Sequence, residues 1–114
     1  MNTNIIINLR FAATHKWPDI PSTESQLYLK YLHRHTFHIQ MKWDVCHDNR
    51  AIEFVDMKNK VERYLKETYG SGNDTPSIGS MSCEMLCKDL MLTFIRAKYV
   101  RVMEDGENGA EVFA

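Results

Sequence analysis

Apolar residues occur at every second position from residue 5 to residue 13, which predicts a strand with one buried face. The members of this row are Ile5, Ile7, Leu9, Phe11 and Ala13. Because successive side chains of a strand point to opposite faces, a row of this kind lies on one side of a sheet. We therefore expect a half-buried strand over residues 4–14, with His15 continuing the apolar parity at its end.

A second alternating segment begins at His33 and extends to about residue 45. One face carries His33, His35, Phe37 and Ile39, and the other carries Arg34, Thr36, His38 and Gln40. Between the two strands, residues 17–30 contain Pro18, Pro21 and a polar cluster, which favours a loop with room for a short helical turn before Tyr31.

The apolar period changes to three or four residues in the middle of the chain. After a polar turn at residues 47–50, apolar side chains at this spacing predict an amphipathic helix over about residues 54–68, and residues 70–76 form the loop that ends it. A second stripe consists of Cys83, Leu86, Cys87, Leu90, Met91 and Phe94. The helix that carries this stripe can be capped by Ser80 or Ser82.

The strand period returns at residues 99–104. Asp-Gly at 105–106 and Asn-Gly at 108–109 are dipeptides typical of hairpin turns, and residues 110–113 form the returning strand. The resulting order is strand, strand, helix, helix, strand, strand (ββααββ). It predicts an α+β protein with an antiparallel four-stranded sheet and two helices on one face. The other face of the sheet needs cover, so we expect a homo-oligomer.

Composition narrows the class of protein. The chain has 114 residues, which suits a single domain over residues 1–114, with 44% hydrophobic and 25% charged residues. Its formal net charge of −1 argues against general binding to nucleic acid or to a membrane surface, because such binding needs an excess of Lys and Arg. The apolar run near Met1 is too short for a signal peptide, no stretch is long enough to span a membrane, and the number of cysteines is odd. We therefore expect a soluble, cytoplasmic protein with reduced thiols.

His33 and His35 can bind one metal ion, because two imidazoles two residues apart on a strand lie on the same face. His15 is the natural third ligand if the first two strands pair, although taken alone it also suits the surface of a strand end. An H-x-H pattern is a weak signal by itself. His38 faces the other way and is expected at a surface or interface. The two cysteines of the second helix have no further soft ligands nearby in sequence, so we interpret them as core residues.

Five segments, in order, resemble the motifs of one known family. They are FAATH at residues 11–15, HRHTF at 33–37, IEFVDMK at 52–58, SCE at 82–84 and VRVME at 100–104. The motifs that they resemble are F-x-A-A-H, H-G-H-N-[FY], V-x-D-F-x-x-L-K, P-T-[SA]-E and V-x-V-x-E. These belong to the 6-pyruvoyl-tetrahydropterin synthase and 6-carboxy-tetrahydropterin synthase family, which adopts the tunnelling fold. The resemblance covers nearly the whole chain.

The resemblance implies a function and a set of site residues. It implies that His15, His33 and His35 hold Zn2+. It also implies that Glu104 binds the edge of a pterin or purine-like ring by accepting hydrogen bonds from ring N–H groups. The implied sites lie between subunits of a trimer, or of two stacked trimers that form a hexamer. The implied activity is that of a zinc-dependent lyase acting on a dihydroneopterin triphosphate-like substrate, in tetrahydropterin or queuosine biosynthesis.

The chain departs from this family at the groups that transfer protons. Family enzymes carry a cysteine four residues before the H-x-H motif, where this chain has Leu29. Lys66 and Glu67 stand where the family has an Asp–His pair, so they are the candidate catalytic residues by position. The residue between the two histidines is Arg34 in place of glycine. Basic groups that could hold a substrate phosphate, or simply form a solvated face, are Lys16, Arg34, Lys42 and Lys98.

Three other functions remain open. The chain can be a non-catalytic pterin- or purine-binding protein that keeps the zinc and the ring pocket. It can be an enzyme of altered chemistry that uses zinc-activated water and a carboxylate such as Glu67 or Glu53. The third alternative is a purely structural oligomer, and the presence of the three histidines and Glu104 speaks against it, because a structural role has no physical need for them.

Overall fold

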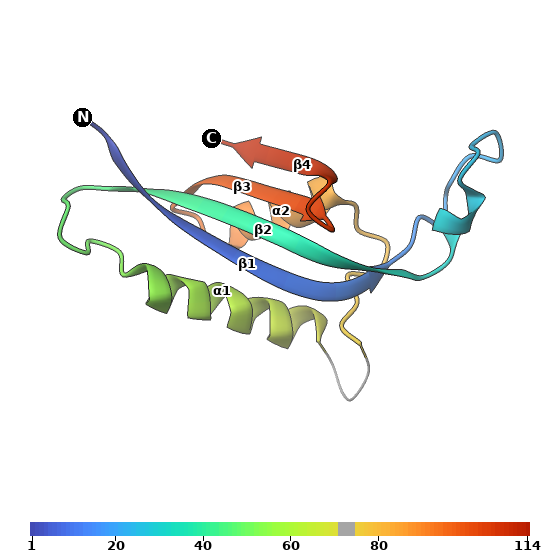
Figure 1. Ribbon diagram of the computed structural model, residues 1–114, viewed down its shortest axis with the longest axis horizontal. Coiled ribbons are helices and arrows are strands. Elements are labelled where there is room, and N and C mark those ends of the chain that lie inside the picture. The colour runs from blue at the N-terminus through green and yellow to red at the C-terminus, as the bar shows by residue number, and fades with distance from the viewer. Residues whose placement is uncertain (71–74) are drawn as a thin grey trace.

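The computed structural model of the protein describes residues 1–70 and 75–114 (Figure 1). Its elements are β1 (Thr3–His15), the 3-10 helix η1 (Leu27–Lys30), β2 (His33–Val45), α1 (Phe54–Tyr69), α2 (Cys83–Thr93), β3 (Ala97–Glu104) and β4 (Asn108–Phe113). This order confirms the predicted ββααββ arrangement, with η1 in the loop expected between the first two strands. Residues 71–74, which belong to the loop predicted after the first helix, lie outside the described residues.

The four strands form one antiparallel sheet in the order β1-β2-β3-β4. Residues that face each other across the strands share a side of the sheet, and one such row consists of Ile7, Met41, Val100 and Val112. The first three members of this row are at most 3% exposed. The alternation in the sequence therefore identifies the buried face of the sheet correctly.

Both helices pack against that face, as predicted (Figure 1). α1 runs along β1 and buries Val61 and Leu65, whereas α2 lies against β3 and β4 and buries Leu86, Cys87 and Leu90. The removal of this apolar surface from water is the main stabilising term of the fold. Within residues 1–70 and 75–114, no helix combines the length and the hydrophobicity needed to cross a membrane.

The two cysteines of α2 are core residues, as their positions on the apolar stripe predicted. Cys83 is 7% exposed and Cys87 is fully buried. Burial raises the pKa of the Cys83 thiol to about 12 and that of Cys87 to about 11. Both thiols are therefore protonated at neutral pH and act as packing groups. Ser82, one of the two predicted caps, accepts a hydrogen bond from the backbone N–H of Met85 at the start of this helix.

The turn between β3 and β4 differs from the prediction. β4 begins at Asn108, which pairs with Glu104, so Asn108-Gly109 is already part of the strand and the turn consists of residues 105–107. Asp105 and Gly106 supply the positive φ angles of this turn, 55° and 74°. Gly109 is needed for a different reason, because a Cβ atom at this position would lie 1.9 Å from the carbonyl oxygen of Val102. In this turn the Asp105 side chain lies next to the candidate site, in contact with His35.

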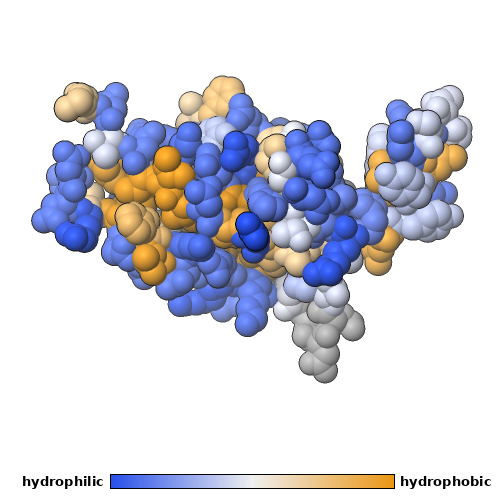
Figure 2. All heavy atoms as spheres, in the orientation of Figure 1, coloured by the Kyte–Doolittle hydropathy of each residue, from blue (hydrophilic) through white to orange (hydrophobic). Residues whose placement is uncertain are grey.

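The helix-free face of the sheet is mixed in character. His38 lies on this face, as expected from its parity, between Arg10 of β1 and Met103 of β3. Figure 2 shows polar side chains over much of the molecule and apolar ones gathered toward the end where the two termini lie. Ile6 is 47% exposed there and Phe113 is 69% exposed. The expectation of a homo-oligomer is compatible with these side chains.

Candidate metal centre

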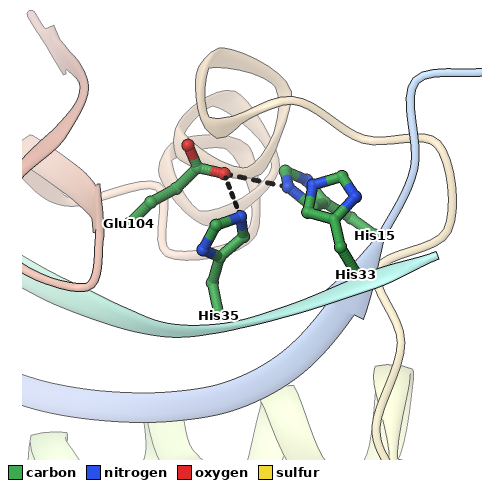
Figure 3. A group of neighbouring side chains, drawn as sticks. All are labelled: His15, His33, His35 and Glu104. Atoms are coloured by element: carbon green, nitrogen blue, oxygen red, sulfur yellow. Dashed lines mark ion pairs between the residues drawn. The ribbon is translucent and has the colours of Figure 1, made fainter. Parts of the chain in front are cut away.

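Three histidines meet at one end of the helix-covered face. His15 is the last residue of β1 and pairs directly with His33, the first residue of β2. His35 lies two residues further along β2 and so points to the same side. Glu104 ends β3 opposite Phe37, which places its carboxylate over the same cluster (Figure 3). One ligand atom from each of the four residues lies within 4.8 Å of the others.

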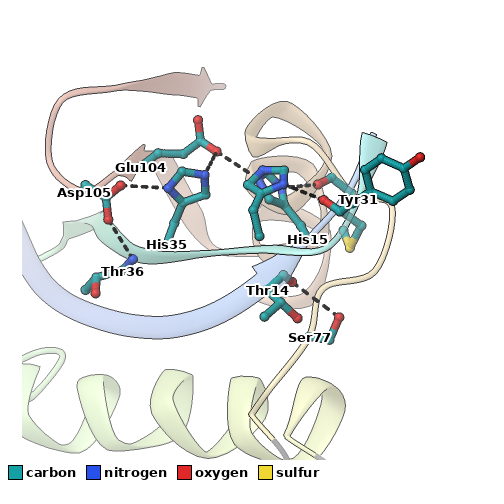
Figure 4. A network of polar contacts seen from close by, with 10 residues as sticks. Thr14, His15, Tyr31, His35, Thr36, Ser77, Glu104 and Asp105 are labelled. Carbon is teal, nitrogen blue, oxygen red and sulfur yellow. Dashed lines mark hydrogen bonds and ion pairs between the residues drawn. The ribbon is translucent and has the colours of Figure 1, made fainter. Parts of the chain in front are cut away.

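Each imidazole is fixed through its Nδ1 atom. His15 Nδ1 lies 3.0 Å from the Met81 carbonyl oxygen, His33 Nδ1 lies 2.8 Å from that of Tyr31, and His35 Nδ1 lies 2.7 Å from Asp105 Oδ2 (Figure 4). An oxygen acceptor at Nδ1 requires the proton to be on that nitrogen. A neutral ring then has its lone pair on Nε2, which is the form in which histidine binds a metal.

The Nε2 atoms of His15 and His35 face the Glu104 carboxylate but make no hydrogen bond of acceptable geometry with it. Glu104 Oε2 is 2.9 Å from His15 Nε2 and 3.0 Å from His35 Nε2. Both nitrogens are buried, and neither finds a partner of acceptable hydrogen-bond geometry in the described part of the chain. In neutral rings with the proton on Nδ1, lone pairs of nitrogen and oxygen point at one another, which is unfavourable unless a second proton or a metal ion lies between them. The donor set therefore fits a metal ion.

An aromatic side chain packs against the imidazole rings of the cluster. Phe37 is fully buried, and its ring centroid lies 5.3 Å from that of His15 and 5.8 Å from that of His35. His15 itself is only 9% exposed. Such a floor keeps water away and strengthens electrostatic interactions with a bound ion.

The segment between the two helices holds His15 in place. Thr14 donates its backbone N–H to the Pro76 carbonyl at 2.9 Å and accepts from the backbone N–H of Ile78 at 3.0 Å. Further along the same segment, the Met81 carbonyl accepts a hydrogen bond from Nδ1 of the His15 side chain. The end of β1 thus gains an additional strand-like neighbour, which sequence periodicity did not predict because the contact is far apart in sequence.

Asp105 is anchored by two neighbouring residues of β2. Its Oδ2 accepts from His35, and its Oδ1 accepts from the backbone N–H of Thr36 at 2.9 Å. The hydrogen bond from His35 and then that from Thr36 lower the pKa of the Asp105 carboxyl group. The sequence suggested only a turn here, and the one signal that could have pointed to a site role was the position next to Glu104.

A pocket of about 550 Å³ is lined by two of the three histidines, His15 and His33, and by Glu104. Leu29 lies on its wall, at the position where the resembled enzymes carry a cysteine. The chemically active side chains that also line it include Lys16 and Glu84. Of the four cations considered for phosphate binding, Lys16 alone belongs to the described lining of this pocket, and Lys42 instead lies over the Tyr99 ring of the sheet.

Lys66 and Glu67 are exposed on α1, and neither lines this pocket. The fold of a single chain therefore does not bring these two predicted catalytic residues to the histidines. Glu53, the other carboxylate considered, caps α1 by accepting from the backbone N–H groups of Val55 and Asp56. It follows the end of β2 that lies opposite the histidines.

Solved structures share this fold over the full chain. An uncharacterised protein of Wolinella succinogenes matches with a TM-score of 0.67 and 12% identity, covering 99% of this chain and 98% of the other. The 6-pyruvoyltetrahydropterin synthase of Plasmodium vivax matches with a TM-score of 0.60 and 15% identity, covering 100% and 98%. A variant of that enzyme, in which a catalytic glutamate is replaced by cysteine, matches with a TM-score of 0.63, 14% identity and the same coverage. No family model and no curated protein matches the sequence.

These likenesses settle the fold. The protein has the fold of 6-pyruvoyltetrahydropterin synthase, so the tunnelling fold predicted from the five motifs is confirmed. At identities of 12–15%, the likeness concerns the course of the backbone alone.

Proposed function

We propose that this protein is a zinc-dependent enzyme of the 6-pyruvoyl/6-carboxy-tetrahydropterin synthase type that acts on a dihydroneopterin triphosphate-like substrate. One observation carries the proposal: three imidazoles, each fixed through Nδ1, converge with a carboxylate at the wall of a pocket. The fold shared with the Plasmodium vivax synthase supports it. The reaction would be a lyase step in tetrahydropterin or queuosine biosynthesis.

Zinc is the ion that this donor set favours. Three neutral imidazoles with room for a further ligand match the pattern of catalytic zinc sites, whereas magnesium and calcium prefer oxygen donors. His15, His33 and His35 are the proposed ligands. When bound, zinc would polarise oxygen atoms of the substrate side chain and make the neighbouring C–H bonds more acidic.

Glu104 is the proposed substrate-binding residue. Its side chain is 30% exposed and lines the pocket, so a planar ring in the pocket can reach it. A carboxylate accepts two parallel hydrogen bonds from adjacent N–H groups, which is the pattern on the edge of a pterin or a guanine-like base. Lys16, on the same pocket, is the proposed contact for an anionic phosphate group.

Two sources of a proton-transfer group are proposed. Lys66 and Glu67 are exposed and absent from the pocket lining of their own chain, so they would act from α1 of a neighbouring copy in a homotrimer or hexamer. Glu84 lines the pocket of the same chain and needs no neighbour. The Plasmodium vivax enzyme also has a glutamate as a catalytic residue. Loss of turnover in Glu67→Gln but not in Glu84→Gln would select the neighbouring copy, and the reverse would select the same chain.

A second function is favoured by one particular residue. Leu29 lies on the pocket wall where a thiol would be expected, and it cannot transfer a proton. A non-catalytic protein that binds a pterin or a purine-like base would keep the metal and Glu104 without such a group. This is the alternative that an activity assay must separate from the first.

The test combines zinc content with substrate turnover. The purified protein is assayed for bound zinc and then incubated with dihydroneopterin triphosphate, and released triphosphate and the pterin product are followed by chromatography. Zinc with turnover supports the enzyme, whereas zinc with ligand binding and no turnover supports the binding protein. Zinc absent from the protein, with His33→Ala behaving like the unmodified chain, contradicts both. His38→Ala is the matched control, because His38 lies on the opposite face of the same strand.

We further propose that residues 1–114 act as one domain in the cytoplasm. One continuous core joins side chains from all four strands and both helices, which supports the domain. The three cysteines are free thiols and two of them are buried, which suits a reducing compartment.

A further inference from the structure

Glu104, the last residue of β3, and Asp105, the first residue of the turn, contact the two ring nitrogens of one histidine. Glu104 Oε2 lies 3.0 Å from His35 Nε2, and Asp105 Oδ2 lies 2.7 Å from His35 Nδ1. Figure 4 shows the two carboxylates on opposite sides of the ring. The other two histidines differ, because Nδ1 of His15 and Nδ1 of His33 each face a backbone carbonyl oxygen in place of a carboxylate.

The Asp105 carboxylate is held in position from two directions. Oδ1 accepts from the backbone N–H of Thr36 at 2.9 Å, and the backbone N–H of Asp105 donates to the Thr36 carbonyl at 2.8 Å. Asp105 therefore docks onto β2 like a strand residue while Oδ2 faces His35. Its side chain cannot leave His35 without also breaking the bond to Thr36.

The backbone conformation of Asp105 shows that the turn does not need a carboxylate. Its φ angle of 55° lies in the left-handed region, which glycine adopts without steric cost and which aspartate tolerates. Glycine would give the same turn, but it would leave His35 Nδ1 without an acceptor. The carboxylate thus contributes to the histidine and not to the turn itself.

We propose that Asp105 is a positioning residue of the metal centre, which holds His35 as the Nδ1–H tautomer with Nε2 directed at the metal. The proposal rests on the proposed zinc site. A negatively charged acceptor at Nδ1 makes Nε2 a better electron-pair donor to a metal than a carbonyl acceptor does. His35 is therefore the strongest of the three proposed ligands. Outer partners of this kind commonly change metal affinity by about 10- to 100-fold.

The test measures zinc affinity and the tautomer of His35 in matched variants. Asp105→Gly keeps the left-handed backbone and removes the acceptor, while Asp105→Asn keeps one acceptor oxygen and removes the charge. Glu107→Gln is the control, because it removes a carboxylate from the same turn. Nitrogen-15 NMR of the metal-free protein at pH 8, where an ordinary imidazole is neutral, reports the tautomer of each ring.

We expect zinc affinity to fall about 10- to 100-fold in Asp105→Gly and less in Asp105→Asn, with no change in Glu107→Gln. His35 loses its preference for Nδ1–H in Asp105→Gly, whereas His15 and His33 keep theirs. Equal zinc affinity and an unchanged His35 tautomer in a folded Asp105→Gly variant overturn the role of Asp105 alone. An unmodified protein that binds no zinc overturns the proposed function instead. If Asp105→Gly fails to fold, the same two readouts on Asp105→Asn decide.

Discussion

The helix-covered face of the sheet has two regions, an apolar one in the middle and the histidine cluster at one end. Both follow the same alternation of inward and outward side chains, but different elements pack over them. In the centre, the row through Ile7, Met41 and Val100 is covered by helices and satisfied by packing alone. At the end, His15 and His33 occupy equivalent positions, but their cover is a loop and a turn. Buried polar atoms need partners, and loops can supply backbone carbonyls that helices use internally.

This difference shows how a site arises from a core pattern. The pairing of β1 with β2 continues without interruption from the apolar rows to the histidines, so the same paired backbone carries both regions. The two regions differ in their side chains and in the elements that pack over them, and the buried Phe37 lies at the boundary between them. We therefore expect the apolar region in the middle of the sheet to determine stability and the histidine end to determine metal binding.

The largest effect on stability is expected from the central region. Trp43→Ala removes a side chain that is 1% exposed, and it should lower the free energy of unfolding by about 3–5 kcal/mol through lost contacts and a cavity. Urea denaturation followed by circular dichroism measures this loss. A loss below about 1 kcal/mol would mean that the two regions do not differ in the way described.

The next largest effect is the gain in stability on zinc binding, which depends on the histidine end of the sheet and not on the apolar region. Zinc at a free concentration about 100 times its Kd should raise the free energy of unfolding by about 2.7 kcal/mol, because the folded state alone holds the three imidazoles together. His33→Ala should abolish this increase while leaving the metal-free protein folded. Thermal or chemical denaturation with and without zinc provides the measurement. An equal increase in His33→Ala would place the bound ion elsewhere.

A smaller effect is expected where α1 joins the cover of the site. Asp89 Oδ2 accepts from Tyr64 at 2.7 Å and from Tyr69 at 2.6 Å, and the Tyr69 carbonyl accepts from Ser77 next to β1. Tyr69→Phe removes one of these bonds and should cost about 1 kcal/mol in a denaturation experiment.

The same tyrosine predicts a dependence on alkaline pH. Burial, followed by the hydrogen bond to Asp89, raises the pKa of Tyr69 above its usual value. The folded state then binds the phenolic proton more tightly than the unfolded chain, so this stabilisation is complete below the unfolded pKa of about 10 and decreases as pH rises above it. Denaturation curves between pH 8 and pH 11 should show a shallower loss for Tyr69→Phe; identical slopes would contradict the assignment.

The smallest effect is expected on the helix-free face. His38→Ala should change the free energy of unfolding by no more than about 0.5 kcal/mol and leave zinc affinity unaltered, since this side chain lies on the face of β2 opposite the three histidines. Loss of zinc affinity in this variant, measured by calorimetric titration, would remove the distinction between the two faces of β2.

Sequence reasoning succeeded where periodicity determines which way a side chain points. His15, His33 and His35 share the parity of the apolar rows, so their convergence followed once β1 and β2 were paired. The partners of these histidines could not be predicted, because Met81 and Asp105 lie 66 and 70 residues away from the histidines that they contact. Only tertiary packing brings such segments together.

The motifs named four residues that the structure brings together, His15, His33, His35 and Glu104, whereas the two acid–base candidates lie outside the lining of the adjacent pocket. Glu104 was expected to bind a ring, and it also faces two of the imidazoles. Lys66 and Glu67 were selected by position relative to one segment, and sequence alone cannot assign a partner to exposed residues of a helix. Asn108-Gly109 was expected in a turn because the pattern does not distinguish a positive φ angle from a close backbone approach.

X-ray absorption spectroscopy of the zinc-loaded protein tests the central claim most directly. We expect one zinc per chain with three imidazole nitrogen ligands at about 2.0–2.1 Å, completed by an oxygen ligand. A sulfur ligand at about 2.3 Å, or fewer than three nitrogen ligands, would contradict it, because the ion would then not be held by His15, His33 and His35.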